Sequence, residues 1–361
     1  MRTKTRSRFV AAHVCVLAVA GSFAGSIRAQ SSVQLYGQLD MFVGSTRAMD
    51  GQRAAVLNSG GLQTSYWGMR GTEDLGGGLK AIFDLNGFYR GDTGRSGRTD
   101  TDGFLTRSAY IGFQSASLGT VRMGRNTTPY FLSTILFNPL VDSYNFAPSI
   151  FQTYKTASGS SVFDPGIIGD SGWNNSVVVS SPNFGGLTAN GIYSFGEQPG
   201  ATGQNKWGAN LTYFAGDFGA TVAYQQVKFN SVPGDVTTPA SLQGFDRQSA
   251  VQAGISYDFK VAKLFAQGQY IRTRINSASG DIKHVNGQVG ASIPLGAGSV
   301  LASYAYGRVS NDVGEFRRNS VGLAYDYNLS KRTDIYAAYF YDKVSDRSHA
   351  DTIGLGIRHK F

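Results

Sequence analysis

The sequence predicts an all-β fold, a sixteen-stranded antiparallel β-barrel that spans a membrane. Three observations predict it. Polarity alternates residue by residue in many segments, short connections alternate with long ones, and no segment beyond the N-terminal region has eighteen consecutive apolar residues. The composition agrees, because 47 glycines, 19 tyrosines and 23 phenylalanines among 361 residues favour strands and turns over helices.

The alternation is clearest near the start of the predicted barrel. A strand with one wet and one apolar side changes polarity at every residue. One face there carries Val33, Leu35, Leu39, Met41 and Val43. The other face carries Gln34, Tyr36, Gln38 and Asp40. A soluble sandwich would alternate as well, so this pattern alone leaves both architectures open.

The connections favour the barrel. Short turns are predicted at 74–78, 116–119, 182–186, 215–217, 258–262, 294–298 and 328–332. Longer polar connections fall around 45–64, 90–103, 127–174, 196–205, 229–246, 273–280, 309–317 and 343–349. Fifteen connections join sixteen strands, and a regular short and long order is typical of outer-membrane barrels with tight periplasmic turns and long external loops.

Residues 1–29 read as a secretory signal peptide. Four basic residues precede an apolar run, 9–20, that is too short to span a bilayer, and small residues follow up to Ala29. An N-terminal membrane anchor is the alternative, but no stop-transfer pattern follows. The barrel domain is then 30–361, with a formal charge of about +4, since five of the basic residues behind the total of +9 are removed. Cys15, the only cysteine, leaves with the signal peptide, so no disulfide is expected.

Catalytic and cofactor chemistry is not indicated. The histidines that remain are His284, His349 and His359; none has a recognisable catalytic setting, and we expect them at the surface or an interface. No phosphate-binding glycine loop or metal-ligand spacing is present, so no enzyme activity, cofactor or metal is predicted. The mild basic excess is spread over loops, which fits binding of anionic lipopolysaccharide better than nucleic acid.

Six segments, in order along the chain, resemble the general porins of Gram-negative bacteria, especially the β-proteobacterial branch. They are SSVQLYGQLD, SYWGMRGTEDLGGGLKAIF, TRSAYIGFQSASLGTVRMGRN, NNSVVVSSPNFGGL, NLSKRTDIYAAY and GIRHKF. The resemblance implies a homotrimer in the outer membrane that lets ions and small hydrophilic solutes diffuse passively. It also implies that the third external loop folds into the lumen. The terminal Phe361 resembles the C-terminal signal that the outer-membrane assembly machinery reads.

Candidate constriction residues come from the third loop and from the wall. The 48-residue connection 127–174 carries Asp142, Asp164 and Asp170; each could equally be a solvated loop carboxylate, and Asp142 is the preferred candidate. On the wall, alternation points Arg70 toward water. The resemblance adds Arg107 and Arg125, although Arg125 shares the parity of apolar neighbours unless Gly124 forms a bulge.

The sequence leaves undecided the sign of ion selectivity and the role of the aromatic residues in the third loop. Tyr66 stands where the family motif has an arginine, so the sign of ion selectivity is undecided. Seven aromatic residues crowd the third loop: Tyr130, Phe131, Phe137, Tyr144, Phe146, Phe151 and Tyr154. They could form the track of a substrate-specific outer-membrane channel, but packing of the loop against the barrel wall is the favoured interpretation.

Overall fold

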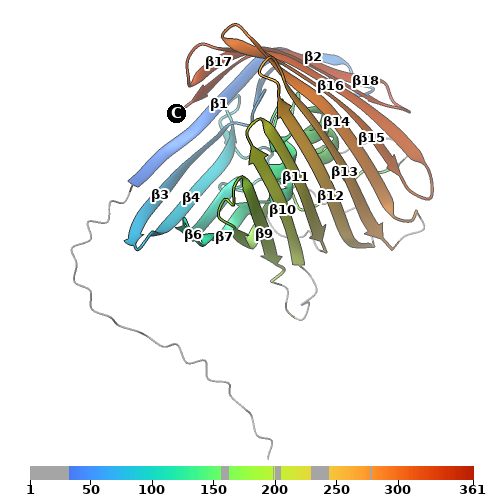
Figure 1. Ribbon diagram of the computed structural model, residues 1–361. Helices are drawn as coiled ribbons and strands as arrows, with labels where there is room; N and C mark the ends of the chain where they lie inside the picture. Colours follow the sequence, from blue (N-terminus) through green and yellow to red (C-terminus); the bar gives the residue numbers. More distant parts are fainter. Residues whose placement is uncertain (1–31, 156–161, 198, 200–204, 229–243, 277–278) are drawn as a thin grey trace, which may run out of the picture.

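The computed structural model describes residues 32–155, 162–197, 199, 205–228, 244–276 and 279–361 (Figure 1). The predicted signal peptide, residues 1–29, lies outside this part. The chain forms one closed antiparallel sheet, in which each wall strand pairs with its neighbour and β18 returns to pair with β1. The predicted sixteen-stranded antiparallel barrel is confirmed.

The sheet contains eighteen strands, but two of them do not add to the number of strands that form the barrel wall. Strands β2 (Arg53–Ser59) and β3 (Tyr66–Gly76) both pair with β1 (Ser32–Arg47), so together they form the second wall strand. Strand β5 (Arg95–Ser96) is a two-residue pairing inside an external loop. The first long connection is therefore residues 48–52, much shorter than the predicted 45–64.

The remaining wall strands follow in chain order. They are β4 (Leu79–Arg90), β6 (Ser108–Ser115), β7 (Gly119–Thr127), β8 (Gly172–Ser180), β9 (Leu187–Phe195), β10 (Asn205–Ala215), β11 (Phe218–Val227), β12 (Phe245–Asp258), β13 (Lys263–Ile275), β14 (Ile282–Leu295), β15 (Gly298–Ser310), β16 (Glu315–Asn328), β17 (Thr333–Val344) and β18 (His349–Lys360). Each of the seven predicted short turns falls between two consecutive strands of this series.

The two faces of the wall differ in the way a barrel in lipid requires. On β13, Leu264 and Tyr270 point outward and are 46% and 43% exposed, whereas Gln267 and Gln269 point inward and are buried. The outer face thus offers apolar side chains to lipid, and these two inward-facing amides are hydrogen-bonded to the third loop. No helix in the described part is long and apolar enough to cross a membrane.

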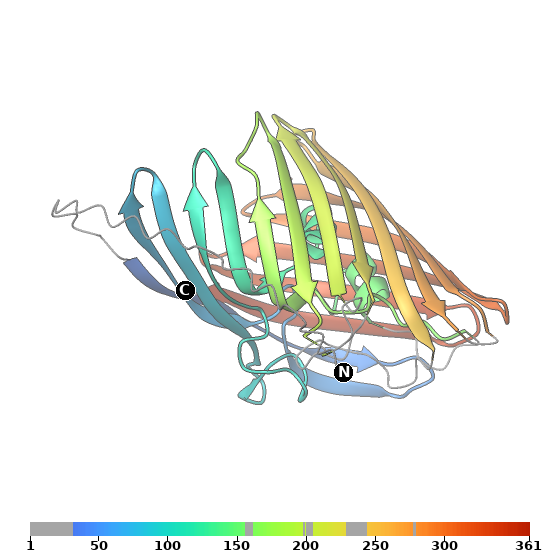
Figure 2. The ribbon, with the colours of Figure 1, turned by 90° about the horizontal axis from the view of Figure 1, so that it is seen from below.

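The described parts of the third loop, residues 128–155 and 162–171, lie inside the barrel, where Figure 2 shows the green helices of this loop. Helix α1 (Pro129–Leu136) begins with proline at its first position, and the Thr128 hydroxyl caps it by accepting from the Phe131 N–H at 3.1 Å. Helix α2 (Pro148–Tyr154) follows. The helices contact β10 to β12 and β14 to β16, so the loop covers the inner face of that half of the wall.

Side chains of the loop replace water as partners of the inward-facing polar groups. The Tyr130 hydroxyl donates to Gln269 Oε1 at 2.9 Å, and Gln152 Nε2 donates to the Ala305 carbonyl at 3.1 Å. Most of the loop aromatics are buried in apolar clusters against the wall, as the favoured interpretation of the sequence expected. These contacts hold the loop in place, since buried polar groups without partners would cost stability.

The barrel closes where the chain ends. The Phe361 N–H donates to the Gly37 carbonyl and the Gly37 N–H donates to the Phe361 carbonyl, both at 3.1 Å. A Cβ on Gly37 would lie 2.5 Å from the Tyr66 carbonyl oxygen and 2.7 Å from the Phe361 ring. Glycine is therefore required at this close approach of the first and last wall strands.

Candidate constriction site

Three arginines with inward-facing side chains line the wall formed by β3, β6 and β7. Each guanidinium stacks on a tyrosine ring: Arg70 on Tyr36 at 4.7 Å, Arg107 on Tyr66 at 4.0 Å and Arg122 on Tyr110 at 5.2 Å, from the guanidinium carbon to the ring centre. Among the described residues, none of these arginines has a carboxylate within ion-pair distance. The stacks orient the three charges without neutralising them.

The strand register places the three arginines along the pore axis. Arg70 lies opposite Asp84, and Asp84 lies opposite Tyr110 on the next strand. Arg107 precedes Tyr110 toward the external end, whereas Arg122 lies nearer the turn at the other end. Asp84 is bound by the Tyr36 hydroxyl at 2.7 Å and supplies one negative charge to a wall with three positive charges. We name Arg70, Arg107 and Arg122 the basic stripe.

Tyr66 explains how this chain departs from the family motif. Its ring lies beneath Arg107 and meets Tyr36 edge-on, with 6.0 Å between ring centres. A tyrosine at this position therefore supplies a platform for a neighbouring guanidinium in place of a further positive charge.

Asp142 is the loop carboxylate that reaches this wall. Gln63 Nε2 donates to its Oδ1 at 3.0 Å, and Gln63 Oε1 accepts from Arg358 Nη1 at 2.9 Å. Burial raises the pKa of Asp142, although the hydrogen bond from Gln63 and the charges of Arg107 and Arg358 act in the opposite direction. The Asp142 carboxylate thus lies within the electrostatic reach of Arg107 on the wall and of Arg358 on β18, the last strand.

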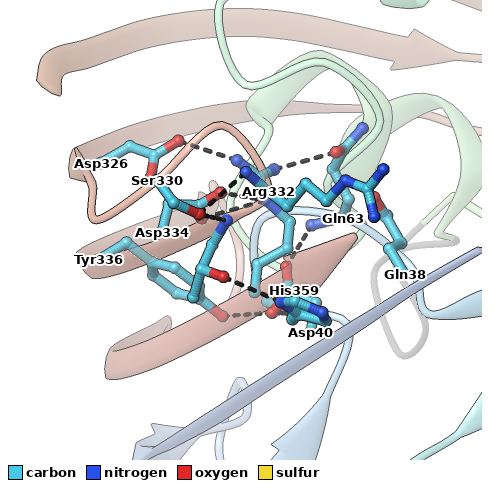
Figure 3. Close-up of polar contacts among 12 residues, drawn as sticks. Gln38, Asp40, Gln63, Asp326, Ser330, Arg332, Asp334, Tyr336 and His359 are labelled. Carbon is cyan, nitrogen blue, oxygen red and sulfur yellow. Dashed lines mark hydrogen bonds and ion pairs between the residues drawn. The ribbon is translucent and has the colours of Figure 1, made fainter. Parts of the chain in front are cut away.

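Arg358 on β18 was not predicted as a site residue. It donates through Nε to Asp334 at 3.1 Å and through Nη2 to Asp326 at 2.9 Å; both aspartates are labelled in Figure 3. The alternation of Leu355 and Ile357 on the outer face would have pointed Arg358 into the lumen, so the signal was present in the sequence.

The segment between β2 and β3 positions Gln63 within this network. Asp40 Oδ1 accepts from the Gly61 N–H at 2.9 Å, and its Oδ2 accepts from the Gln63 N–H at 2.8 Å. The Tyr336 hydroxyl also donates to Asp40, which is fully buried. Figure 3 shows Asp40, Gln63 and Tyr336 close together on the inner wall.

Arg125 faces inward because β7 carries a bulge. The pairing with β8 shifts register between Gly124 and Asn126, and Gly124 has a φ of +133°, which favours glycine. The bulge that the sequence required at Gly124 is present. Arg125 is buried and donates to the Thr106 carbonyl at 2.6 Å, to Asn174 Oδ1 at 2.7 Å and to Asp170 Oδ2 at 3.0 Å.

Asp170 is neutralised at the end of the third loop. It pairs with Arg125 and, through both oxygens, with Arg98 of the second loop at 2.8 and 2.9 Å. Arg98 also binds Asp102, so two arginines and two aspartates form one closed cluster. Burial opposes ionisation of Asp170, but the two arginines outweigh it and lower its pKa. The cluster joins the second and third loops to β7.

Asp164 and His284 form a second contact between the loop and the wall. The Gly166 N–H donates to Asp164 Oδ1 at 2.9 Å, and His284 Nδ1 lies 3.5 Å from the same oxygen. His284 is buried on β14, so the expectation of a surface or interface histidine is wrong for this residue, because the inserted loop covers it. No group of three or more potential metal ligands occurs in the described part.

The comparisons with known proteins agree with this architecture. The family model described as Gram-negative porin matches residues 15–347. Outer membrane porin protein 32 of Delftia acidovorans is 33% identical over 92% of this chain and 88% of its own length. An outer membrane porin protein of Bordetella pertussis is 29% identical over 95% of this chain and 98% of its own length.

A solved structure of similar shape is the anion-selective porin from Comamonas acidovorans. It superposes with a TM-score of 0.75 at 28% identity and covers 92% of this chain and all of its own. The relatives point to a channel rather than an enzyme, and they do not favour the alternative of a substrate-specific channel. The chain belongs to the family of Gram-negative porins and forms a channel in the outer membrane.

Proposed function

We propose that this porin prefers anions and lets ions and small hydrophilic solutes diffuse passively. The constriction in this proposal lies between Arg70, Arg107 and Tyr66 on the wall and Asp142 on the third loop. The observation that carries it is the basic stripe, whose three guanidinium groups face the lumen without an ion-paired carboxylate in the described part. An unpaired charge in a narrow bore with low-dielectric walls acts strongly on a passing ion.

The opposing carboxylates weaken this preference without cancelling it. Asp84 and Asp142 supply two negative charges near the stripe, and the described network around Arg358 already pairs Asp326 and Asp334 with an arginine. The Comamonas acidovorans relative is an anion-selective porin at 28% identity, which supports the same sign here. Charges on both sides of the constriction also order water, which penalises apolar solutes.

For Arg125, Asp164 and Asp170 we propose an indirect role. Arg125 and Asp170 are ion-paired and Asp164 lies against His284, so these residues contribute to the constriction by holding the third loop rather than by contacting ions. Removing one of them would then change loop stability more than the sign of selectivity.

The remaining proposals concern maturation and assembly. We propose that residues 1–29 are removed on export and that residues 30–361 form homotrimers surrounded by lipid and lipopolysaccharide. Phe361 would be read by the outer-membrane assembly machinery before it closes onto Gly37. No cofactor, metal or nucleic acid enters this proposal.

The test is the reversal potential of reconstituted channels across a KCl gradient at low salt. Replacing Arg70 and Arg107 by glutamine should shift the reversal potential toward cation selectivity, and the shift should shrink at high salt, where the Debye length falls to about 3 Å. The matched control replaces Lys260 and Lys331, two exposed residues in turns at the barrel end, by glutamine. This double change should shift the reversal potential little. Equal shifts in both double variants would contradict the proposed constriction.

A further inference from the structure

A second feature of the channel is a cavity of about 480 Å³ on the external side of the constriction. Its walls come from the end of β2 and the segment after it, from the end of β4 and from the second and third loops. Neither the basic stripe nor Asp142 lines it. The volume is within the range of small-molecule sites, so a solute can occupy it before reaching the constriction.

Aromatic rings form much of the cavity wall. Tyr89, Tyr144 and Tyr154 line it together with Ile167. The Tyr144 and Tyr154 rings meet edge-on with 6.1 Å between their centres, and Phe131 fixes Tyr154 from behind at 5.2 Å. Rings held in this way offer a preformed surface to a flat apolar group.

The Tyr154 hydroxyl is a polar group of this wall that lacks a partner. It is shielded from solvent, and it makes no hydrogen bond in the described part. A solute in the cavity does not reach this hydroxyl, so Tyr154 contributes its ring to the wall.

Lys155, the next residue along the chain, supplies the charge. No carboxylate lies within ion-pair distance of it in the described part, whereas Arg90 and Arg98 of the same cavity pair with Asp100 and Asp102. The Lys155 amine lies 4.7 Å above the Phe151 ring. Burial, with a smaller effect of the nearby Arg318, lowers its pKa to about 8, so the amine is still mainly protonated at neutral pH.

The negative charges of the lining do not cancel this lysine. Asp170 is held by Arg98 and Arg125 in the closed cluster. Asp92 also lines the cavity, but it is exposed, so water screens its charge. The cavity therefore combines an unpaired cation with a set of fixed aromatic rings.

We propose that this cavity is a transit site for small aromatic carboxylates. The Lys155 amine binds the carboxylate, while the ring of the solute lies among Tyr89, Tyr144 and Ile167. The proposal rests on the channel function, and it names one solute class that the pore handles differently from chloride or acetate. Binding is weak, because a transit site must release its solute toward the constriction.

The experiment records single-channel KCl current while benzoate is added to the external side. Acetate tests the contribution of the charge alone, and benzyl alcohol tests that of the ring alone. Benzoate should reduce the current in a saturable way at concentrations where acetate and benzyl alcohol have no such effect. Lys155→Gln should raise the half-blocking concentration about tenfold, as expected for loss of a charged partner, whereas Tyr154→Phe keeps the ring and should leave this concentration unchanged.

The pH dependence adds a test specific to the lysine. Block of the wild type should weaken between about pH 7 and pH 9 as the amine loses its proton, and Lys155→Gln should show no such change. Lys331→Gln, a change in an exposed turn, serves as the control and should behave as the wild type. Heat-modifiable migration checks that each variant is folded.

The outcomes separate this inference from the channel function. Open channels that benzoate blocks no better than acetate, or in which benzoate blocks Lys155→Gln as it blocks the wild type, would overturn the transit site and leave the porin function intact. Folded protein that passes no KCl current at all would contradict the channel function itself. If Lys155→Gln fails to fold, the wild-type titrations with benzoate, acetate and benzyl alcohol, and the pH dependence of the benzoate block, still decide.

Discussion

Replacing Asp170 by asparagine should destabilise the barrel through its buried charge cluster. The carboxylate accepts from Arg98 at 2.8 and 2.9 Å and from Arg125 at 3.0 Å, and only 3% of its side chain is exposed. Asparagine keeps the shape but removes the charge, which leaves Arg125 without a carboxylate partner. Breaking a buried pair by neutralising one member costs about 3 to 5 kcal/mol, because the remaining charge stays desolvated.

Asp100 offers a matched control on the protein surface. It also pairs with two arginines, Arg90 at 2.6 Å and Arg95 at 3.1 Å, but 67% of its side chain is exposed. Asp100→Asn should therefore change stability little, since water and salt already screen the pairs. The assay is urea unfolding of the refolded protein in detergent, followed by tryptophan fluorescence and by heat-modifiable migration.

A double-variant cycle makes the test sharper. Arg125→Gln combined with Asp170→Asn should cost less than the sum of the two single changes, with a coupling of about 0.5 to 3 kcal/mol. Equal unfolding midpoints for Asp170→Asn and Asp100→Asn would refute the reasoning. Strict additivity in the cycle would show that the two side chains do not act as a pair.

Three further predictions concern the pore and its assembly. Lowering the pH from about 7 to about 5 should strengthen anion preference, because the raised pKa of Asp142 lets it take up a proton earlier than an ordinary carboxyl; the change in reversal potential should be smaller in Asp142→Asn than in the wild type. Deleting Phe361 should lower the yield of heat-modifiable barrel in outer membranes far more than it lowers synthesis, and equal membrane yields would contradict this. Tyr66→Arg should strengthen anion preference at low salt by adding a charge beside Arg107, and an unchanged reversal potential in a conducting channel would show that this wall is assigned wrongly.

Local pattern was enough to predict the barrel. Alternation placed Arg70 on the lumen side. Arg125 has the same parity as its lipid-facing neighbours, so the sequence predicted a bulge at Gly124 that turns the Arg125 side chain to the lumen. Turn residues predicted the seven short connections. The segment 53–59 was missed as a strand, because its pairing with β1 is interrupted before β3 begins and so reads as part of a polar loop.

Partners far apart in the sequence could not be predicted. Asp170 is neutralised by Arg98, 72 residues away, and Asp142 meets Gln63, 79 residues away. The path of the third loop through the lumen decides which of its carboxylates lacks an ion-pair partner. The alternation of polar and apolar residues along a strand does not predict that path. Arg122 and Arg358 had the right parity and lie in segments that resemble the family, but nothing in those segments marked either residue as part of the constriction.

The reversal potential of the wild-type channel across a tenfold KCl gradient at low salt tests the central claim most directly. The unpaired basic stripe predicts a potential of the sign produced by chloride flux, which decreases in magnitude as the salt concentration is raised. A potential near zero, or one of the sign produced by potassium flux, would contradict the proposed anion preference of this porin.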